Sequence, residues 1–253
     1  MTSRTSKPGA TSLRDLAENR ILPAHQVMDR DTLAWIDRNR PEAPAAPPTL
    51  PHPPLMLVPA DTWFAQPQLV DSIHGIRHNA RVSLLAGLLA QEYGLDPDHT
   101  AALCTAAAVH DCRRRDDRDD PGHGRRAALW FTRNQQAVTT MLGRELPPGL
   151  SQQAAIAIGL HDVPYPDFTS QQDLAYQRAP HLIDLLKAAD CLDRYRLPLT
   201  RWWPDPSHLR IVIPAWLHPV AFDLVVRSEQ ARLNGATNHG ALIHARQLLD
   251  RRQ

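Results

Sequence analysis

The sequence predicts an all-α protein, and two observations lead to this prediction. Apolar residues recur at helical spacing over most of residues 76–252, whereas runs that alternate between apolar and polar residues are scarce. The best strand candidate is the short run Ile-Val-Ile at 211–213. Apolar residues make up 43% of the 253 residues, which is enough for a sizeable core. We therefore expect one main helical bundle with N-terminal and C-terminal helical additions.

Residues 1–60 are expected to form an N-terminal region made of a tail, short helices and a proline-rich strap. The first residues are small and polar, and short helices are predicted at 13–20 and 31–40, the second capped by Asp31. Residues 41–54 contain seven prolines, which lack an N–H and fix φ, so a stiff extended segment is predicted there. A connector is favoured over a ligand for a partner protein.

The central region, residues 61–200, is predicted to contain five helices of the main domain. They are expected at 76–93, from Asp96-Pro97 to His110, and at 123–134, 151–161 and 180–196. Residues 201–253 are predicted to add two amphipathic helices, at 215–232 and 238–252, that pack on this domain.

Composition excludes several classes of protein. Lysine and arginine number 28 against 27 aspartates and glutamates, and this near-neutral balance argues against a dedicated nucleic-acid-binding protein. No apolar run reaches the ~18–20 residues of a membrane span, and the polar N-terminus is not a secretory signal. The three cysteines lack CxxC spacing, which fits a reducing compartment. We expect a cytoplasmic protein with no membrane partner.

Histidines and aspartates occupy positions where they face the predicted core. His78 shares a helical stripe with leucines, His110 and Asp111 end an alanine-rich helix, His161 ends another apolar helix, and Asp190 points inward. A buried carboxylate without a partner costs several kcal/mol, and buried imidazoles also need partners. A divalent cation would satisfy all of these groups, and the ligand types suit Mn, Fe, Co, Ni or Zn.

Taken singly, each of these residues also has a structural interpretation. An inward histidine is often a hydrogen-bonded core residue, and Asp190 could instead pair with Arg194 one turn later. The order of the residues along the chain shifts the balance toward a metal site.

That order resembles the HD superfamily of metal-dependent phosphohydrolases over residues 70–200. The matching segments are His78-Asn-Ala-Arg81-Val82, Ala-Val-His110-Asp111 and Leu-Lys187-Ala-Ala-Asp190-Cys-Leu-Asp193. The resemblance implies an HD-domain helical bundle in which one metal is bound by His78, His110, Asp111 and Asp190. A second His-Asp dipeptide, at His161, shows that the dipeptide alone is weak support.

Two further histidines resemble those of the two-metal members of this superfamily. His123 and His161 fall between the HD pair and the last aspartate. In such members the residue corresponding to Asp111 bridges the two ions. The sequence does not decide between one ion and two, nor the metal among Mn, Fe, Co, Ni, Zn and Mg. With one ion, the two histidines would instead contact phosphate or deliver a proton.

Other charged residues are candidates for contact with the substrate. Asp111 would serve as ligand and as acceptor of a water proton, His123 would act in catalysis, and Lys187 on the face of Asp190 would reach a phosphate. His74 lies one turn before His78, where a structural role is favoured over one at the mouth of the site. The arginines between Asp111 and His123 are interspersed with aspartates, so self-pairing is favoured over phosphate binding.

These features predict a phosphohydrolase that acts on a small nucleotide or another phosphorylated metabolite by attack of metal-bound hydroxide. The chain contains no GxxxxGK[ST], GxGxxG or GxSxG motif, which disfavours P-loop, Rossmann and serine-hydrolase chemistry. Two alternatives remain open: a di-iron oxygenase of the same fold, and a catalytically silent metal-bound sensor or scaffold. A homodimer is compatible with the sequence, which does not decide it.

Overall fold

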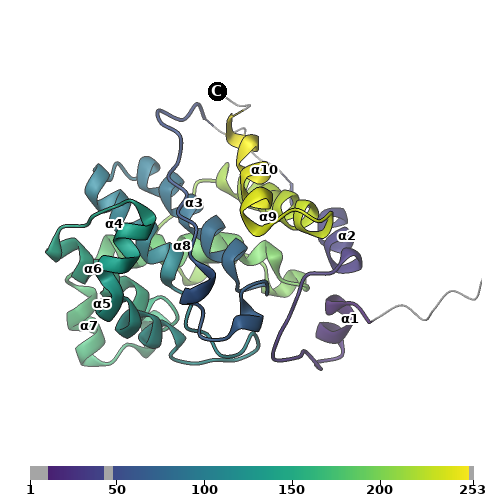
Figure 1. Cartoon of the computed structure of the whole chain (residues 1–253), viewed down its shortest axis with the longest axis horizontal. Coiled ribbons are helices and arrows are strands. Elements are labelled where there is room, and N and C mark those ends of the chain that lie inside the picture. Colours follow the sequence, from purple (N-terminus) through teal and green to yellow (C-terminus); the bar gives the residue numbers. More distant parts are fainter. Residues whose placement is uncertain (1–10, 43–47, 251–253) are drawn as a thin grey trace, which may run out of the picture.

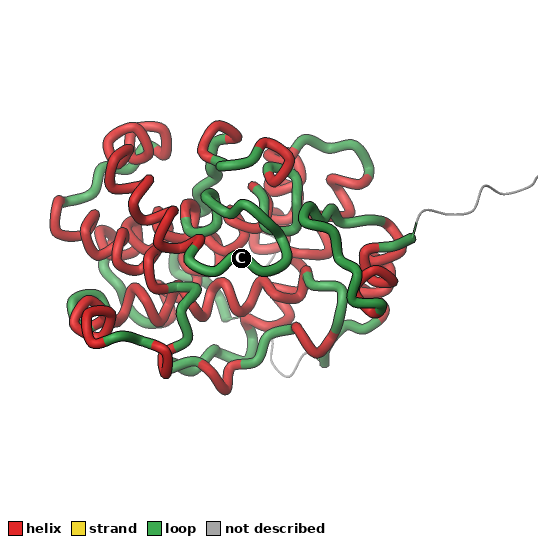
Figure 2. Tube along the Cα trace, turned by 90° about the horizontal axis from the view of Figure 1, so that it is seen from below, coloured by secondary structure: helices red, strands yellow, loops and turns green. Residues whose placement is uncertain are grey.

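The structure of the chain, a computed structural model, describes residues 11–42 and 48–250. Every regular element in these residues is a helix and none is a strand, so the predicted all-α fold is confirmed (Figure 2). The predicted N-terminal tail up to residue 10 and the part of the proline-rich strap at 43–47 lie outside the described residues. The strand candidate at 211–213 was wrong, because no strand lies beside it and Val212 is 79% exposed.

The α-helices follow one another with short 3-10 turns between them. They are α1 (Leu13–Glu18), α2 (Arg30–Arg38), α3 (Ile76–Glu92), α4 (Pro97–Val109), α5 (His123–Leu142), α6 (Pro148–Leu160), α7 (Ser170–Tyr176), α8 (Pro180–Asp193), α9 (Leu217–Leu233) and α10 (Asn238–Asp250). Among the described residues, no helix is both long and apolar enough to span a lipid bilayer.

Helix α3 lies at the centre of the molecule, and two groups of helices pack on either side of it (Figure 1). Helices α4 and α8 pack directly on α3, and α5, α6 and α7 extend the bundle on their side. Helix α9 packs on α3, α8 and α10, while α2 packs on α9. Nearly every residue of α3 is buried as a result, including the polar residues on its first turns.

Three local features differ from the sequence predictions. Helix α5 runs to Leu142 instead of ending at residue 134, because it stops only at Gly143, whose φ of +63° suits glycine. Helix α7 was not predicted, although Thr169 and Gln172 form a capping box at its start. Asp29, not Asp31, caps α2, since its side chain accepts a hydrogen bond from the Thr32 N–H.

Candidate metal centre

The fold brings six of the predicted site residues to one place, and each of them lies on or next to a helix of the bundle. They are His78 on α3, His110 and Asp111 at the end of α4, His123 at the start of α5, His161 at the end of α6, and Asp190 on α8. Three of these helices therefore contribute through their termini, where the chain is free to turn a side chain inward.

The first group of side chains comprises His78, His110, Asp111 and Asp190. The Nε2 atoms of His78 and His110 lie 3.2 Å apart, and Asp111 Oδ2 lies 3.4 Å from His78 Nε2. Asp190 Oδ1 lies 3.5 Å from His78 Nε2 and 3.8 Å from His110 Nε2. The two histidines and Asp111 are buried, whereas the Asp190 side chain is 30% exposed toward a pocket.

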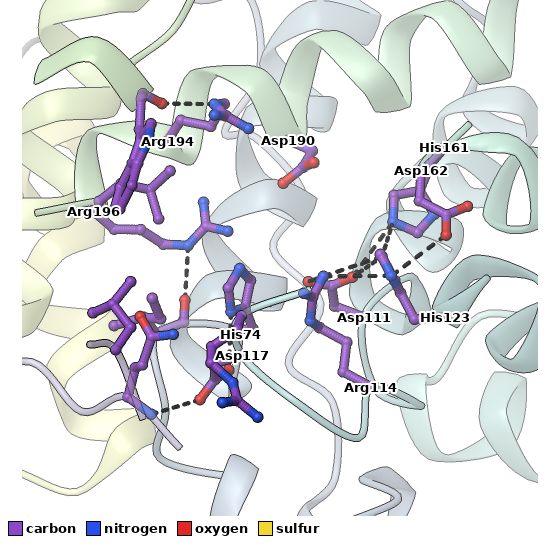
Figure 3. Close-up of a pocket in the computed structure, with 16 residues that line it drawn as sticks. His74, Asp111, Arg114, Asp117, His123, His161, Asp162, Asp190, Arg194 and Arg196 are labelled. Carbon is purple, nitrogen blue, oxygen red and sulfur yellow. Dashed lines mark hydrogen bonds and ion pairs between the residues drawn. The ribbon is translucent and has the colours of Figure 1, made fainter. Parts of the chain in front are cut away.

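The second group comprises Asp111, His123 and His161. Asp111 Oδ1 lies 2.9 Å from His123 Nε2 and 3.4 Å from His161 Nε2, and these two nitrogens are 3.1 Å apart. Asp111 thus lies between the two groups: its Oδ1 faces His123 and His161 (Figure 3) and lies 4.0 Å from His110 Nε2, while its Oδ2 is the oxygen near His78. His78, His110 and Asp111 place ligand atoms close enough to hold a metal ion, and so do Asp111, His123 and His161, while Asp190 lies beside the first set.

The outer nitrogens of the four imidazoles fix which ring nitrogen carries the proton. Nδ1 of His110, His123 and His161 lies 2.7–2.8 Å from the backbone carbonyl oxygen three residues earlier in each case. Nδ1 of His78 lies 2.8 Å from Asp193 Oδ2. Because carbonyls and carboxylates only accept, each Nδ1 carries a proton, and in the neutral ring Nε2 presents a lone pair.

The lone pairs of four Nε2 atoms and the carboxylates of Asp111 and Asp190 therefore lie close together. A cation between them would be stabilised by all of these groups. Asp111 Oδ1 is buried, yet no hydrogen bond reaches it within the described part of the chain. An orphaned buried oxygen of this kind is costly. Imidazole nitrogens held by outer acceptors, together with carboxylate oxygens, are the usual ligands of transition-metal ions, so the donor set fits such a metal.

The electrostatics of the cluster agree with this need. Burial would raise the pKa of Asp111, but Arg114 and the neighbouring histidines outweigh it and hold that pKa well below its usual value. Burial would lower the pKa of His110, but Asp111 and Asp190 raise it above its usual value. The carboxylates thus keep their negative charge in the interior and attract cations or protons.

Two glycines allow the second group to form around the start of α5. Gly122 precedes His123 with a φ of +74°, a left-handed conformation that favours glycine. Gly124 packs so closely on the end of α6 that a Cβ would lie 2.6 Å from the Ile158 carbonyl oxygen and 2.9 Å from His161 Nδ1. The sequence Gly-His-Gly at this position is therefore required for His123 to approach His161.

A pocket of about 550 Å³ opens onto the cluster (Figure 3). Asp111, Asp190, His123 and His161 line it at one end. Its other lining residues are Leu22, Gln26, Ile73, His74, Arg114, Asp117, Arg118, Asp162, Arg194, Arg196, Leu197 and Trp202. We call the six clustered histidines and aspartates the metal-ligand cluster. They adjoin a pocket that also carries four arginines and a small apolar wall.

The segment between α1 and α2 forms one wall of this pocket. The Gln26 N–H donates to Asp117 Oδ2 at 2.8 Å, and the Ile73 N–H donates to the Gln26 carbonyl oxygen at 2.9 Å. Asp117 also accepts from Ser72 Oγ at 2.9 Å and lies 2.9 Å from Nδ1 of His74. His74 thus lines the pocket while being held by a structural carboxylate.

Lys187 does not take the position expected of it. Its Nζ donates to the carbonyl oxygens of His161 at 2.8 Å and of Val163 at 2.6 Å, and it is not among the residues that line the pocket. The ammonium group holds the turn after α6 instead of facing a substrate. The alternative pairing of Asp190 with Arg194 does not form, because Arg194 Nε donates to the Trp202 carbonyl oxygen.

Four other polar residues at the site were not assigned a role from the sequence. Asp193 orients His78, Asp162 lies 3.4 Å from Nδ1 of His123, and Asp117 and Arg196 line the pocket. Asp193 lies one turn after Asp190 on the same helix, which is the one sequence signal that could have identified it. In and next to the arginine-rich loop, Arg118 pairs with Asp116 and Arg126 with Asp120, as expected, whereas Arg114 pairs with Asp111 and Arg113 donates to the Trp63 carbonyl oxygen.

Comparison of the chain with protein-family models, with curated proteins and with solved structures found no match. The resemblance to the HD superfamily therefore stays a prediction that rests on the residues quoted above. The functional interpretation of the site has to come from its own geometry and charge.

Proposed function

We propose that the protein is a metal-dependent phosphohydrolase with two divalent cations at the shared cluster. One cation would be held by His78, His110, Asp111 and Asp190, and the other by Asp111, His123 and His161. The observation that carries this proposal is the convergence of four imidazole Nε2 atoms and the orphaned Asp111 oxygen on one volume. The order of these residues, which resembles the HD superfamily, points to the same chemistry.

The ligand set favours particular metals. Four imidazoles and two carboxylates suit Mn, Fe, Co, Ni or Zn better than Mg, which prefers oxygen ligands. When bound, such cations would supply a nucleophilic hydroxide from water at neutral pH and offset charge on phosphate oxygens. Asp111 would contribute to holding both cations, because it belongs to both groups of ligands.

The pocket supports a small anionic substrate. Arg114, Arg118, Arg194 and Arg196 line it together with the metal-ligand cluster, and arginine recognises phosphate through its planar fork of donors. Its volume of about 550 Å³ lies in the range of small-molecule sites. A phosphorylated metabolite, including a nucleotide, therefore fits the pocket better than a polymer does.

Asp162 lies behind the second group of ligands, with its Oδ2 3.4 Å from Nδ1 of His123. Its Oδ1 atom is buried without a hydrogen-bond partner among the described residues, and the residue lines the pocket. Its Oδ2 accepts from the Gly124 N–H at 3.3 Å, which fixes the direction of the free oxygen. Asp162 would therefore help to hold the His123 ring in place beside the second group of ligands.

The direct test is hydrolysis of a panel of nucleotides and sugar phosphates by protein loaded with Mn, Co, Ni, Zn, Fe or Mg, with release of inorganic phosphate measured. We expect activity with at least one metal and its loss by at least about 100-fold in Asp111→Asn, which removes charge from the shared ligand. Asp205→Asn is the matched control, because Asp205 is exposed and lies outside the pocket.

Two outcomes would contradict the proposal. Activity that survives in the double variant His110→Ala, Asp111→Ala would place the catalytic site elsewhere. Two bound irons with consumption of oxygen and no phosphate release would assign the site to the di-iron oxygenase alternative instead.

A further inference from the structure

Arg196 is a buried arginine with an incomplete set of partners. It lies in the 3-10 turn Arg194–Arg196 that follows α8, and it is 4% exposed. Its Nε donates to the Ile73 carbonyl oxygen at 2.7 Å. Its Nη1 is buried and makes no hydrogen bond within the described part of the chain. The carboxylate nearest to this nitrogen among the ion pairs is Asp193, at 3.6 Å.

Asp193 does not accept a hydrogen bond from Arg196, because Arg81 and His78 already contact both of its carboxylate oxygens. Arg81 donates to both oxygens of Asp193, at 2.7 and 2.9 Å, and His78 lies 2.8 Å from one of them. Arg81 has all three of its guanidinium nitrogens hydrogen-bonded, which is the normal condition of a buried arginine. Arg196 departs from that condition, because its buried Nη1 has no hydrogen bond among the described residues, and the residue lines the pocket.

The guanidinium of Arg196 points into the pocket beside Asp190 and His74 (Figure 3). Burial lowers the pKa of Arg196, and the charges of Asp193, Asp190 and Asp111 only partly offset this effect. Arginine nevertheless stays protonated in proteins, so the group is a buried and poorly compensated positive charge. Cations held by Asp111 and Asp190 would reduce the compensation further, which makes an incoming anion more favourable.

The other arginines of the pocket each have a hydrogen-bond or ion-pair partner, and within the described residues none of them is left with an orphaned buried nitrogen. Arg194 donates to the Trp202 carbonyl oxygen at 2.7 Å, and Arg118 pairs with Asp116 in the exposed loop. Arg114 Nη1 lies 3.6 Å from Asp111 Oδ2, while its Nε donates to the Asp116 carbonyl oxygen. Among the described residues that line the pocket, Arg196 is therefore the arginine with a buried nitrogen that lacks a hydrogen bond.

We propose that Arg196 binds non-bridging oxygens of the substrate phosphate at the metal end of the pocket. This inference rests on the proposed phosphohydrolase function, because it places the phosphate between Arg196 and the metal ligands. The planar guanidinium matches two oxygens of one phosphate, whereas a lysine ammonium would provide a point charge only.

The test measures binding of inorganic phosphate to the Mn-loaded full-length protein by titration calorimetry. Arg196→Gln is expected to weaken phosphate binding by about 10- to 100-fold, since a charge-assisted hydrogen bond is lost. Arg196→Lys is expected to lie between the wild type and Arg196→Gln. Arg126→Gln is the matched control, because Arg126 is a partly buried arginine that pairs with Asp120 outside the pocket and should leave phosphate affinity unchanged.

Metal content and the thermal midpoint of unfolding are measured on the same samples. Phosphate affinity equal to that of the wild type, in an Arg196→Gln protein with its full metal content, would overturn the inference and leave the hydrolase proposal standing. Should Arg196→Gln lose its metal or its fold, Arg196→Lys decides, and an unchanged phosphate affinity in that variant overturns the inference.

Hydrolysis of p-nitrophenyl phosphate separates this inference from the proposed function. We expect KM to rise in Arg196→Gln as phosphate affinity falls. A wild-type protein that binds phosphate through Arg196 but hydrolyses no phosphate ester under any metal would refute the hydrolase proposal while supporting the anion site.

Discussion

Two buried polar clusters meet on helix α3, and they are completed in opposite ways. In the first, Arg77 and Arg81 pair with Glu229 and Asp193, and Arg81 also donates to Ser228, at distances of 2.7–3.1 Å. We call this set the arginine–carboxylate network. In the second, the metal-ligand cluster, acceptors and lone pairs face one another around an orphaned oxygen of Asp111.

The difference teaches how to tell a structural cluster from a functional one. The arginine–carboxylate network is satisfied by the chain alone, so folding completes it. The metal-ligand cluster has negative and electron-rich groups with too little positive charge between them, so folding leaves it incomplete. His78 connects the two, because its Nδ1 contacts Asp193 of the network while its Nε2 faces the cluster.

The largest effect on stability is expected from a variant that removes one carboxylate from the arginine–carboxylate network. Glu229→Gln leaves the buried Arg77 and Arg81 with one negative charge fewer, and we expect the free energy of unfolding to fall by about 3–5 kcal/mol. Denaturant unfolding measures this. Glu18→Gln is the control, because Glu18 belongs to an exposed pair with Arg14 and should change stability by less than about 1 kcal/mol.

The two clusters respond differently to that variant. Glu229 contacts none of the imidazoles, so the metal content of the folded Glu229→Gln protein should match that of the wild type. A large loss of bound metal in fully folded Glu229→Gln protein would show that metal binding depends on the arginine–carboxylate network, and would contradict the independence of the two clusters.

Asp117 is another buried carboxylate, and burial makes the stability of the protein depend on its protonation. Burial raises the pKa of Asp117 to about 6, although the Gln26 N–H and Ser72 hydroxyl favour its charged form. A raised folded-state pKa gives stability that is fully present below the unfolded value of 3.8 and is lost as pH rises through 6. The loss amounts to at most about 3 kcal/mol.

The measurement is the difference in unfolding free energy between the wild type and Asp117→Asn from pH 4 to pH 7.5. Stability of the wild type relative to the variant should decline over this range, because asparagine does not titrate. Burial holds the pKa of the neighbouring His74 well below its usual value, so His74 stays neutral throughout. A difference that is flat with pH would contradict the prediction.

Asp193 probes the boundary between the two clusters. Asp193→Asn weakens the acceptor that orients His78, and we expect metal affinity to fall by about 10- to 100-fold although Asp193 is not a ligand. Chelator competition measures the affinity. Asp184→Asn is the matched control on the same helix, because Asp184 is buried but bonds the Tyr165 and Tyr176 hydroxyls. Equal metal affinities in the two variants would contradict the positioning role of Asp193.

The smallest expected effect concerns Lys187. Lys187→Met removes two hydrogen bonds to carbonyl oxygens after α6, and we expect a loss of stability of about 1–2 kcal/mol. Phosphate release should fall modestly at most, since the ammonium does not line the pocket. A loss of activity as large as that of Asp111→Asn would restore the catalytic role predicted from the sequence.

The sequence predicted the helices and the six residues of the metal-ligand cluster because both follow local patterns. Apolar spacing marks α3 and α8, and an alanine-rich helix that ends in a His-Asp pair marks α4. The mistaken bounds have local causes too. The polar residues after 134 favour helix as well as loop, and α5 continues through them until Gly143.

Contacts between distant segments could not be predicted in this way. Asp117 joins the N-terminal segment to the pocket through Gln26, 91 residues away in sequence, and no periodicity predicts that pairing. Arg196 is significant because its buried Nη1 lacks a hydrogen bond, which is visible only when the surrounding groups have been placed. The position of Lys187 differs from the expected one, because helical spacing gives a face but not the carbonyl groups of a neighbouring turn.

The most direct test of the two-cation centre is the metal stoichiometry of the purified protein, measured by elemental analysis and by titration of the metal-free chain. We expect two transition-metal ions per wild-type chain and one per chain in His161→Ala, in which the first group of ligands stays intact. A wild-type chain that folds fully but binds no transition metal at micromolar concentration would contradict the interpretation of the cluster.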